Sequence, residues 1–338
     1  MAPKWIQRFQ QTIIIQSEPQ SELEYIMLLQ MALADSYSIA FEFVEDSADR
    51  PNTLTEFYQH PKYKDMKPGC YTDDTQRALA NALMVLEYGK YQNNRTHAAL
   101  FNPIAYVTAY QNIFRQDPRP GYSRRFEAFL KENLDTPASQ MASKIKRRST
   151  NGAVMGAAPL GFLKDLNDVK LAAAAQALST HSHKTIPYAQ IVALSAHYCI
   201  HNLGRIPELS DWLVTNMRES DPELEEIIDR ATYPASPQRL PKRADMEAQT
   251  AVEVMLWALP RERSLSDLIK LAVDIGGDTD STAAIITAVA SEHYIYQDDL
   301  PEALIEGMEN GPKGRDYLAS IDDELHKIFT EDTSSILR

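Results

Sequence analysis

The feature that most constrains this 338-residue chain is an acidic turn that opens an apolar helix. Residues 274–282 read Asp-Ile-Gly-Gly-Asp-Thr-Asp-Ser-Thr, and the run from Ala283 to Ala290 that follows is almost wholly apolar. A helix that is apolar on all sides is a buried one, so the carboxylates at its start are expected at the edge of the core. Burying an unpaired charge is costly. Asp278 and Asp280 should therefore be hydrogen-bonded, paired or bound to a metal ion.

The chain repeats this arrangement well upstream, where residues 71–75 read Tyr-Thr-Asp-Asp-Thr and open a helical pattern over 76–88. Capping alone could explain either motif, because Asp, Ser and Thr are preferred at helix N-termini and acidic groups there interact favourably with the helix dipole. Two adjacent acids with hydroxyls, present twice, exceed what capping requires. Carboxylates and hydroxyls are the hard oxygen ligands that Mg²⁺, Mn²⁺ or Ca²⁺ prefers. The pair of motifs therefore predicts a site for two divalent cations, which would balance the four carboxylates.

Two further segments complete a set of four motifs. Residues 32–43 read Ala-Leu-Ala-Asp-Ser-Tyr-Ser-Ile-Ala-Phe-Glu-Phe, and residues 151–161 read Asn-Gly-Ala-Val-Met-Gly-Ala-Ala-Pro-Leu-Gly. In this order, and with the two acidic motifs, they resemble the motifs of the ADP-ribosyl glycohydrolases. That all-helical family includes dinitrogenase reductase-activating glycohydrolase and the ADP-ribosyl-acceptor hydrolases. The resemblance spans residues 25–290.

The chain departs from the family pattern at four positions. Ala34 and Ser38 stand where the family usually has glycine, Gly156 replaces a usual arginine, and Ser281 replaces a threonine. Ala34 and Ser38 can change the course of the loop between Asp35 and Glu42. Gly156 removes any contact that the usual arginine makes, whereas Ser281 keeps the hydroxyl of the usual threonine.

The resemblance implies an all-α fold, a compact single-domain bundle of a dozen or more helices around a cleft for two metal ions. The implied cofactors are two divalent cations, Mg²⁺ or Mn²⁺. Their expected ligands are Thr72, Asp73, Asp74, Asp278, Asp280 and Ser281. The expected substrate-binding residues are Asp35, Ser149, Thr150, Asn151, Gly152, Met155, His181, Gly276 and Gly277.

The implied reaction is hydrolysis of an ADP-ribosyl bond on a modified protein, with ADP-ribose as a product. Its transition state resembles an oxocarbenium ion, whose charge and position must be controlled. Glu42 is the candidate general base or proton shuttle, and the competing interpretation is a solvent-facing Glu at a helix end. Asp73 and Asp280 are also expected to be catalytic residues. Asp35 is expected to shape the loop or to hold a metal ligand in place.

Arginine is the favoured linkage. The Thr-Asp-Asp-Thr motif at 72–75 matches the dinitrogenase reductase-activating branch, and a chain with a net charge of −13 can accept a guanidinium leaving group beside acidic residues. Serine-linked ADP-ribose and small ADP-ribose esters are alternatives, because they present the same ribose. Two other classes stay open: an inactive binding or structural protein on this fold, and an immunity-type protein whose N-terminal arm blocks a cognate ADP-ribosyltransferase. Intact acidic motifs argue against an inactive protein.

Composition indicates the class of protein and the cell compartment in which this activity is expected. Apolar residues make up 44% and charged residues 24% of the chain, as in ordinary globular proteins. No apolar run is long enough to span a membrane, and residues 1–20 do not form a signal peptide. Cys70 and Cys199 have no disulfide or metal spacing, so two reduced thiols and a cytoplasmic location are expected. The net charge disfavours nucleic acid as a partner.

Helical periodicity dominates the chain, and Thr12–Gln16 is the one short strand candidate. Gly89 is expected to end the second helix. The four motifs must converge on one site, which predicts a single domain over 21–330, an N-terminal arm over 1–20 and a tail over 331–338. The predicted helices cover 21–43, 76–88, 97–115, 123–133, 138–147, 152–164, 168–181, 187–203, 222–231, 245–259, 265–274 and 314–328.

A few other polar and aromatic groups allow a functional and a structural interpretation. The basic run 144–148 could hold a diphosphate or form a solvated face. In Thr180-His181 the resemblance suggests a nucleotide contact for the histidine, whereas structural roles are expected for His183, His197 and His201. Packing is favoured over adenine stacking for Tyr71, Tyr106, Tyr110 and Tyr122, and packing is expected for Trp5, Trp212 and Trp257.

Overall fold

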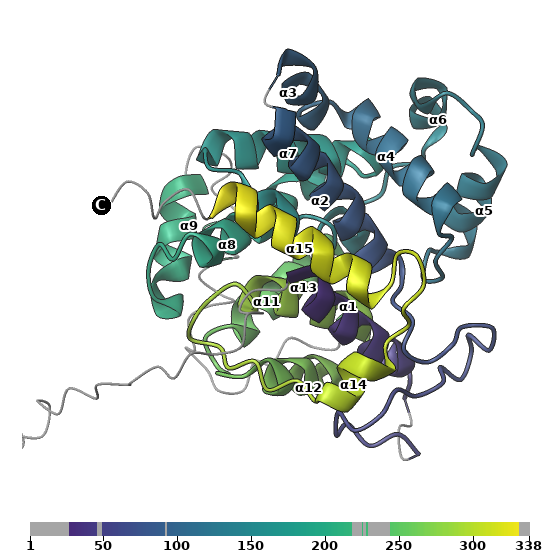
Figure 1. Cartoon of the computed structure of the whole chain (residues 1–338), viewed down its shortest axis with the longest axis vertical. Coiled ribbons are helices and arrows are strands. Elements are labelled where there is room, and N and C mark those ends of the chain that lie inside the picture. Colours follow the sequence, from purple (N-terminus) through teal and green to yellow (C-terminus); the bar gives the residue numbers. More distant parts are fainter. Residues whose placement is uncertain are drawn as a thin grey trace, which may run out of the picture.

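The computed structural model describes residues 27–45, 49–91, 93–217, 225, 228 and 244–330. In this part of the chain the regular elements are helices, and backbone pairing between loops is limited to isolated bridges. Figure 1 shows α1 (Met27–Ser38) and α13 (Thr279–Ala290) in the middle of the molecule, with α15 (Arg315–Phe329) across α1. The predicted all-α, single-domain fold is confirmed.

The central pair explains why the fold closes on itself. Every residue of α1 and of α13 is buried, which is the behaviour expected of helices that are apolar on all sides. The start of α1 is capped from α15, where the Asp322 carboxylate accepts hydrogen bonds from the backbone N–H groups of Leu28 and Leu29 at 3.0 and 3.1 Å. The start of α13 is tied to the end of α1, because the Thr279 hydroxyl donates to the Ser38 carbonyl oxygen at 2.8 Å.

The remaining helices surround this pair. Helices α2 and α15 pack on α1, α11 and α12 pack on α13, and α7 packs between α4 and α8. The α-helices are α2 (Asp73–Tyr91), α3 (Asn94–Leu100), α4 (Pro103–Gln116), α5 (Arg124–Glu132), α6 (Ala138–Lys144), α7 (Leu166–Thr180), α8 (Ile186–Ile200), α9 (Leu209–Met217), α11 (Ala248–Ala258), α12 (Leu265–Ile275) and α14 (Glu302–Gly307). The 3₁₀ helices are η2 (Ile39–Phe41), η3 (Asn151–Ala153), η4 (Ala158–Phe162), η5 (His183–Thr185) and η6 (Ile206–Glu208).

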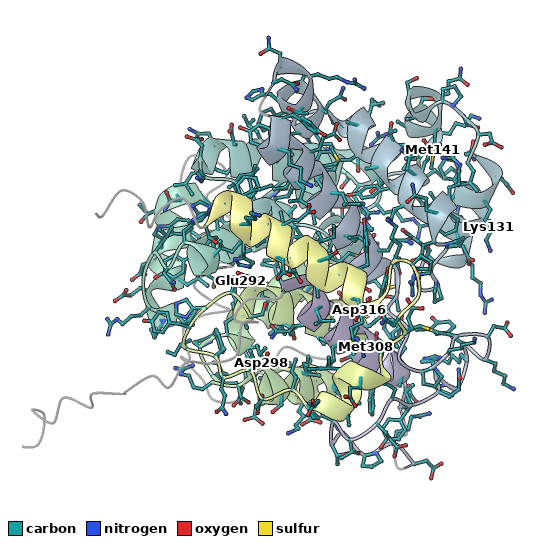
Figure 2. All side chains as sticks on the ribbon, in the orientation of Figure 1. Lys131, Met141, Glu292, Asp298, Met308 and Asp316 are labelled. Atoms are coloured by element: carbon teal, nitrogen blue, oxygen red, sulfur yellow. The ribbon has the colours of Figure 1, made fainter. Side chains whose placement is uncertain are left out.

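A second, smaller apolar cluster lies at one edge of the molecule, where α4, α5 and α6 meet (Figure 1). Met141 belongs to it, whereas the Lys131 side chain points outward and pairs with Glu127 at 2.7 Å (Figure 2). This cluster supports the aromatic face of α5 that borders the pocket described below. Its buried members are Val107, Phe114, Tyr122, Leu130, Met141, Ala142 and Ile145.

Two sequence predictions are wrong for identifiable reasons. Residues 152–164 do not form one helix but two 3₁₀ turns, because Pro159 disfavours helical backbone at the residue before it and offers no N–H. Gly89 does not end α2, which continues to Tyr91. A Cβ at Gly89 would lie 2.6 Å from the Phe329 ring, so this glycine serves the close packing of α2 on α15.

Other predictions differ at their ends or fall outside the described residues. The predicted helix over 21–43 continues after Ser38 as the 3₁₀ helix η2, and the helix predicted to reach 147 ends at Lys144. Cys70 and Cys199 are free thiols, and Trp212 and Trp257 pack against the core as expected. The strand candidate 12–16, the arm 1–20, Trp5, the tail 331–338 and most of 222–231 lie outside the described residues.

Candidate active site

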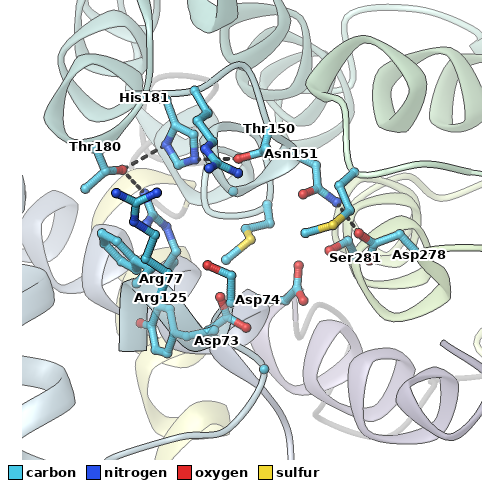
Figure 3. Close-up of a pocket in the computed structure, with 18 of the residues that line it drawn as sticks. Asp73, Asp74, Arg77, Arg125, Thr150, Asn151, Thr180, His181, Asp278 and Ser281 are labelled. Carbon is cyan, nitrogen blue, oxygen red and sulfur yellow. Dashed lines mark hydrogen bonds between the residues drawn. The ribbon is translucent and has the colours of Figure 1, made fainter. Parts of the chain in front are cut away.

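A pocket of about 360 Å³ opens where the starts of α2 and α13 face each other. Figure 3 shows Asp73 and Asp74 on one side of the shared space and Asp278 with Ser281 across it. Its acidic end is lined by Glu42, Asp73, Asp74, Asp278, Asp280 and Ser281. Its other walls include Arg77, Gly121, Tyr122, Arg125, Phe126, Phe129, Lys144, Lys146, Arg148, Thr150, Asn151, Gly152, Met155, Thr180, His181 and Met246.

The start of α2 is capped from another helix. The Asp35 carboxylate of α1 accepts hydrogen bonds from the Thr72 N–H at 2.9 Å, the Thr75 N–H at 3.2 Å and the Thr75 hydroxyl at 2.7 Å. Because Asp35 satisfies these donors, Asp73 and Asp74 are not needed as caps and can turn toward the pocket. The Thr72 hydroxyl donates to one oxygen of Asp74 at 3.2 Å, and the other oxygen has no hydrogen-bond partner.

The start of α13 is shaped by a glycine turn. Gly276 and Gly277 have φ angles of 74° and 90°, which favour glycine. A Cβ at Gly277 would lie 1.8 Å from the Ala244 carbonyl oxygen, and that oxygen accepts from the Asp278 N–H at 3.0 Å. The turn thus presses against the segment at Ala244, and α13 begins with no side-chain cap of its own. Asp280 enters the pocket from the first turn of α13.

The carboxylates meet in two overlapping groups. Oxygens of Asp35, Asp74 and Asp280 lie within 4.8 Å of one another, and so do oxygens of Glu42, Asp278 and Asp280. Burial raises the pKa of Asp74 and of Asp280 well above the usual range, and the neighbouring charges of Asp73 and Glu42 respectively raise them further. The crowding of buried acids is unfavourable without positive charge between them.

The available donor atoms fit hard divalent cations. One oxygen each of Asp35, Asp74 and Asp280 is buried without a hydrogen-bond partner among the described residues, although buried polar atoms are normally paired. Asp278 is held in place by the Asn151 amide, which donates to it at 2.9 Å. Carboxylate oxygens grouped in this way are the ligands that Mg²⁺ and Mn²⁺ prefer.

Glu42 lies at the rim of the acidic end, directly after η2. The loop is fixed by the Phe43 N–H, which donates to the Gly277 carbonyl oxygen at 2.7 Å, and by His60, whose Nε2 lies 3.1 Å from the Glu42 carbonyl oxygen. Burial, with the charge of Asp278, raises the pKa of Glu42 to about 7, and a hydrogen bond with the Tyr63 side chain opposes the shift. A carboxyl group with this pKa can exchange a proton near neutral pH.

The opposite wall carries hydrogen-bond donors and positive charge. Thr150, Asn151 and Gly152 line it at the start of η3, and His181 lies behind them at the end of α7. The side chains of Arg125, Lys144, Lys146 and Arg148 border the mouth and are exposed. The pocket therefore has an acidic end and a basic end, which suits a ligand that carries both hydroxyl and phosphate groups.

Comparison with known proteins agrees with this arrangement. The sequence model of the family described as ADP-ribosylglycohydrolase matches residues 26–334. The chain belongs to the ADP-ribosylglycohydrolase family. Membership in this family supports hydrolysis of an ADP-ribosyl bond as the activity.

The fold of this chain is also found among solved structures. An "ADP-ribosylglycohydrolase-related protein complex" superposes with a TM-score of 0.66 at 20% sequence identity, over 90% of this chain and 97% of that chain. At this identity the likeness concerns the fold alone. No curated protein sequence matches the chain significantly. Among the described residues, no helix combines the length and apolarity needed to cross a membrane.

The four motifs converge around the pocket, but not every expected residue borders it. Asp35 and Thr72 are fully buried behind the acidic end. Gly276 and Gly277 shape the turn described above, and Ser149 is bonded to the Ser182 hydroxyl at 2.9 Å. The expected residues that do line the pocket are Glu42, Asp73, Asp74, Thr150, Asn151, Gly152, Met155, His181, Asp278, Asp280 and Ser281.

Several side chains at the basic end escaped the sequence analysis. Phe126 and Phe129 of α5 line the pocket, whereas Tyr106 and Tyr110 are core residues and only Tyr122 of the four tyrosines reaches the wall. A paired spacing of aromatic residues on a charged helix was the available signal for α5. The basic run 144–148 does border the mouth in part, although Arg147 is bonded to the carbonyl oxygens of Leu178 and Ala142. His197 and His201 lie outside the pocket, in contact with each other.

Gly156, where the family usually has arginine, packs closely against α2. A Cβ at Gly156 would lie 3.2 Å from the Cβ of Arg77 and 2.8 Å from the Asn81 amide nitrogen, so a side chain there would displace Asn81. The Arg77 guanidinium is buried, packs over the Tyr110 ring at 4.2 Å and lines the pocket. An arginine one helical turn after Asp73 and Asp74 was the signal in the sequence that pointed to this wall.

Proposed function

We propose that this chain is a divalent-cation-dependent hydrolase that removes mono-ADP-ribose from a modified protein, with arginine as the favoured linkage. The observation that supports this proposal best is the set of buried carboxylate oxygens on Asp74 and Asp280 in the pocket and on Asp35 behind it, which have no hydrogen-bond partner among the described residues. The opposite end offers positive charge, as a diphosphate requires. Family membership adds the ADP-ribosyl bond as the bond that is cleaved.

Two cations, Mg²⁺ or Mn²⁺, fit the acidic end. Bound there, they would supply positive charge for the hydroxyls of the distal ribose and for a nearby water. Asp35 has a larger part here than in the sequence-based expectation, since one of its carboxylate oxygens lies within 4.8 Å of an oxygen of Asp74 and of Asp280. The remaining proposed ligands are Thr72, Asp73, Asp278 and Ser281.

Side chains of the protein supply proton transfer and substrate binding. Glu42 takes a proton from the attacking water, since its pKa of about 7 leaves it partly ionised at neutral pH. Asn151 holds Asp278 in place through their hydrogen bond of 2.9 Å. Thr150 and Gly152 bind the part of the ligand that extends toward the basic end. The enclosing walls limit the access of other water molecules to the reacting carbon.

The linkage is proposed from the charge at the acidic end. A guanidinium leaving group would lie beside Glu42, Asp278 and Asp280, which favour a departing cation. The net charge of −13 is a poorer guide, because the mouth at the other end is lined by exposed lysines and arginines. A cognate ADP-ribosyltransferase remains a candidate partner, and the arm that would block it lies outside the described residues.

The first test concerns the cations. Asp280→Ala should remove nearly all turnover and weaken Mn²⁺ binding measured by calorimetry, while circular dichroism stays helical. Exposed Asp211 on α9 gives a matched control, and Asp211→Ala should leave both readouts unchanged. Full turnover by the unaltered protein after exhaustive dialysis against EDTA would rule the proposal out.

The second test concerns the linkage. A time course on arginine-linked, serine-linked and polymeric ADP-ribose at matched concentration should give the fastest release from arginine. Faster release from serine would overturn the linkage and leave the hydrolase proposal standing. Removal of residues 1–20, followed by a binding assay with a transferase, separates the immunity-type alternative from a plain enzyme.

A further inference from the structure

Four side chains form a continuous line of hydrogen bonds from α2 to the pocket wall (Figure 3). The Arg77 guanidinium donates to the Thr180 hydroxyl at 2.9 Å. That hydroxyl lies 2.8 Å from Nδ1 of His181, and Nε2 of His181 lies 3.1 Å from the Thr150 hydroxyl. Arg77, Thr180 and His181 are buried, and Thr150 borders the pocket.

The arginine fixes the direction of this line. A guanidinium group can only donate, so the Thr180 oxygen accepts and its hydrogen must find another acceptor. Nδ1 of His181 is the acceptor within reach, which places the proton of the neutral imidazole on Nε2. The reverse orientation would leave the Thr180 hydrogen buried and unpaired, which is unfavourable. Burial and the charge of Arg77 both lower the pKa of His181, in keeping with a neutral ring.

The last member of the line faces the ligand. Since Nε2 of His181 donates to the Thr150 oxygen, the Thr150 hydrogen is free to point into the pocket. Without Arg77 at its head, the line could reverse and Thr150 would present lone pairs there instead. Gly152 leaves room for this contact, because a Cβ at that position would lie 2.9 Å from Nε2.

A second donor lies at the head of the line. Nε of Arg77 is buried and has no hydrogen-bond partner among the described residues, and Arg77 is one of the residues that line the pocket. Burial raises the pKa of Asp73 on the same helix, and the charge of Arg77 opposes that rise. Arg77 therefore adds positive charge to this part of the pocket as well as a donor at the head of the line.

We propose that Arg77 is a positioning residue that, through Thr180 and His181, holds the Thr150 hydroxyl as a hydrogen-bond donor toward the ligand's diphosphate. The inference rests on the proposed function, and it adds the proton arrangement that this wall needs. The exposed lysines and arginines at the mouth add attraction but no orientation.

The test interrupts the line at Thr180. Thr180→Val removes the hydroxyl at nearly constant volume, and Thr180→Ser keeps it. ADP-ribose should bind Thr180→Val roughly tenfold more weakly, the worth of about one hydrogen bond, while adenosine binds equally to both. Thr180→Ser should restore the dissociation constant. Thr185→Val is the matched control, because Thr185 is a buried threonine whose hydroxyl bonds the Ser182 carbonyl oxygen outside the line.

A spectroscopic readout tests the orientation without ligand or cation. Long-range ¹H–¹⁵N correlation spectra should show the Nε2–H tautomer of His181 in the unaltered protein and a shift toward Nδ1–H in Thr180→Val. An Nδ1–H tautomer in the unaltered protein, or equal ADP-ribose affinity in Thr180→Val, would overturn the proposal. If the unaltered protein binds no ADP-ribose, the proposed function fails. In that case titration with pyrophosphate tests the diphosphate contact separately. Weaker pyrophosphate binding by Thr180→Val than by the unaltered protein would support it, and no pyrophosphate binding by the unaltered protein would refute it.

Discussion

At the scale of single residues, Gly121 approaches Asp73 too closely for any side chain. Its φ angle is 104°, and a Cβ there would lie 2.2 Å from an Asp73 carboxylate oxygen. In the same loop, the Pro120 carbonyl oxygen accepts a hydrogen bond of 2.9 Å from the Asp73 N–H. The loop is anchored by Arg119, which bonds Asp117 at 2.6 Å. The position of one acidic group is thus set by a glycine outside every sequence motif.

We expect Gly121→Ala to displace Asp73 and to weaken Mn²⁺ affinity by about 10–100-fold, the usual effect of disturbing the support of a metal ligand. The left-handed backbone should also cost roughly 1–2 kcal/mol of stability. Gly307→Ala is the control, because a Cβ there meets its nearest neighbour, Phe57, at 3.5 Å. Calorimetric titration with Mn²⁺ measures the difference, and unchanged affinity in Gly121→Ala would contradict the assigned role of the loop.

Glu42 gives a prediction on rate and pH. Glu42→Gln should lower kcat by about 10²–10⁴-fold, since the amide cannot accept a proton, with little change in ADP-ribose affinity. A base must be ionised, so kcat/KM of the unaltered enzyme should rise with pH through a value near the Glu42 pKa of about 7, shifted downward by bound cations. Glu87→Gln, at an exposed carboxylate on α2, is the control. A variant that loses affinity but keeps kcat would make Glu42 a positioning residue.

At the scale of elements, the Asp35 carboxylate of α1 caps the start of α2 and also lies beside the acidic end of the pocket. Asp35→Ala would leave the Thr72 and Thr75 N–H groups unpaired, and each buried unsatisfied donor costs about 1–3 kcal/mol. The exposed N-cap of α7 offers a comparison, because Asp165 accepts from two backbone N–H groups at 2.8 and 3.2 Å. Asp165→Ala should cost only about 1 kcal/mol and leave Mn²⁺ binding intact, whereas Asp35→Ala should weaken it. Denaturant unfolding and calorimetry on both variants check this, and equal losses would refute a special role for Asp35.

The elements also show where sequence reasoning reaches its limit. The helical periodicity that predicted α2, α4 and α8 depends on local spacing, which a sequence displays directly, and the apolar run that predicted α13 is equally local. The prediction of one helix over 152–164 was wrong because small and apolar residues are compatible with both helices and tight turns. Pro159 favours the turns. Gly89 misled because its constraint is a neighbouring helix, remote in sequence.

The same distinction applies to the site. The acidic motifs were visible because each lies within a few consecutive residues. Arg77, Phe126 and Phe129 were missed because they reach the pocket only through packing of α2 and α5 against other segments. Asp35 was identified, but its capping of α2 depends on a contact between helices that no spacing within one segment reveals.

At the scale of the whole molecule, charge is unevenly spread. The chain carries a net charge of −13, yet Arg125, Lys144, Lys146 and Arg148 border the pocket mouth. We expect Lys146→Ala to raise the dissociation constant of ADP-ribose about two- to fivefold, the weight of an exposed ion pair, and added salt to reduce this difference. Lys131→Ala is the control, because Lys131 pairs with Glu127 away from the pocket. Equal effects of both substitutions would mean that the rim does not act specifically.

Buried acids should make the cation-free protein sensitive to alkali. The pKa values of Asp74 and Asp280 are raised in the folded state, chiefly by burial, above the ordinary value near 4 that applies when the chain is unfolded. Their contribution to stability is therefore full below about pH 4 and is lost as pH rises toward the folded pKa values. In EDTA the free energy of unfolding should therefore fall as the pH rises above the ordinary pKa value of about 4. Added Mn²⁺ should reverse most of that fall.

Denaturant unfolding at several pH values, with and without Mn²⁺, measures this dependence. Asp280→Asn should flatten it, because the amide does not titrate. A free energy of unfolding that rises with pH in EDTA would show that these carboxylates are not the groups that govern it.

The central position of α1 has a consequence for synthesis of the chain. The hydrogen bond between Leu28 and Asp322 joins residues 294 positions apart, so the first described helix obtains its cap only after α15 has left the ribosome. At roughly 5–20 residues per second, a segment with no polar face waits for about 15–60 s. During that interval we expect Met27–Ser38 to be accessible to chaperones that hold nascent apolar segments. A ribosome-bound chain that stops before α13 would expose that segment and would lack the part of the acidic end that Asp278, Asp280 and Ser281 supply.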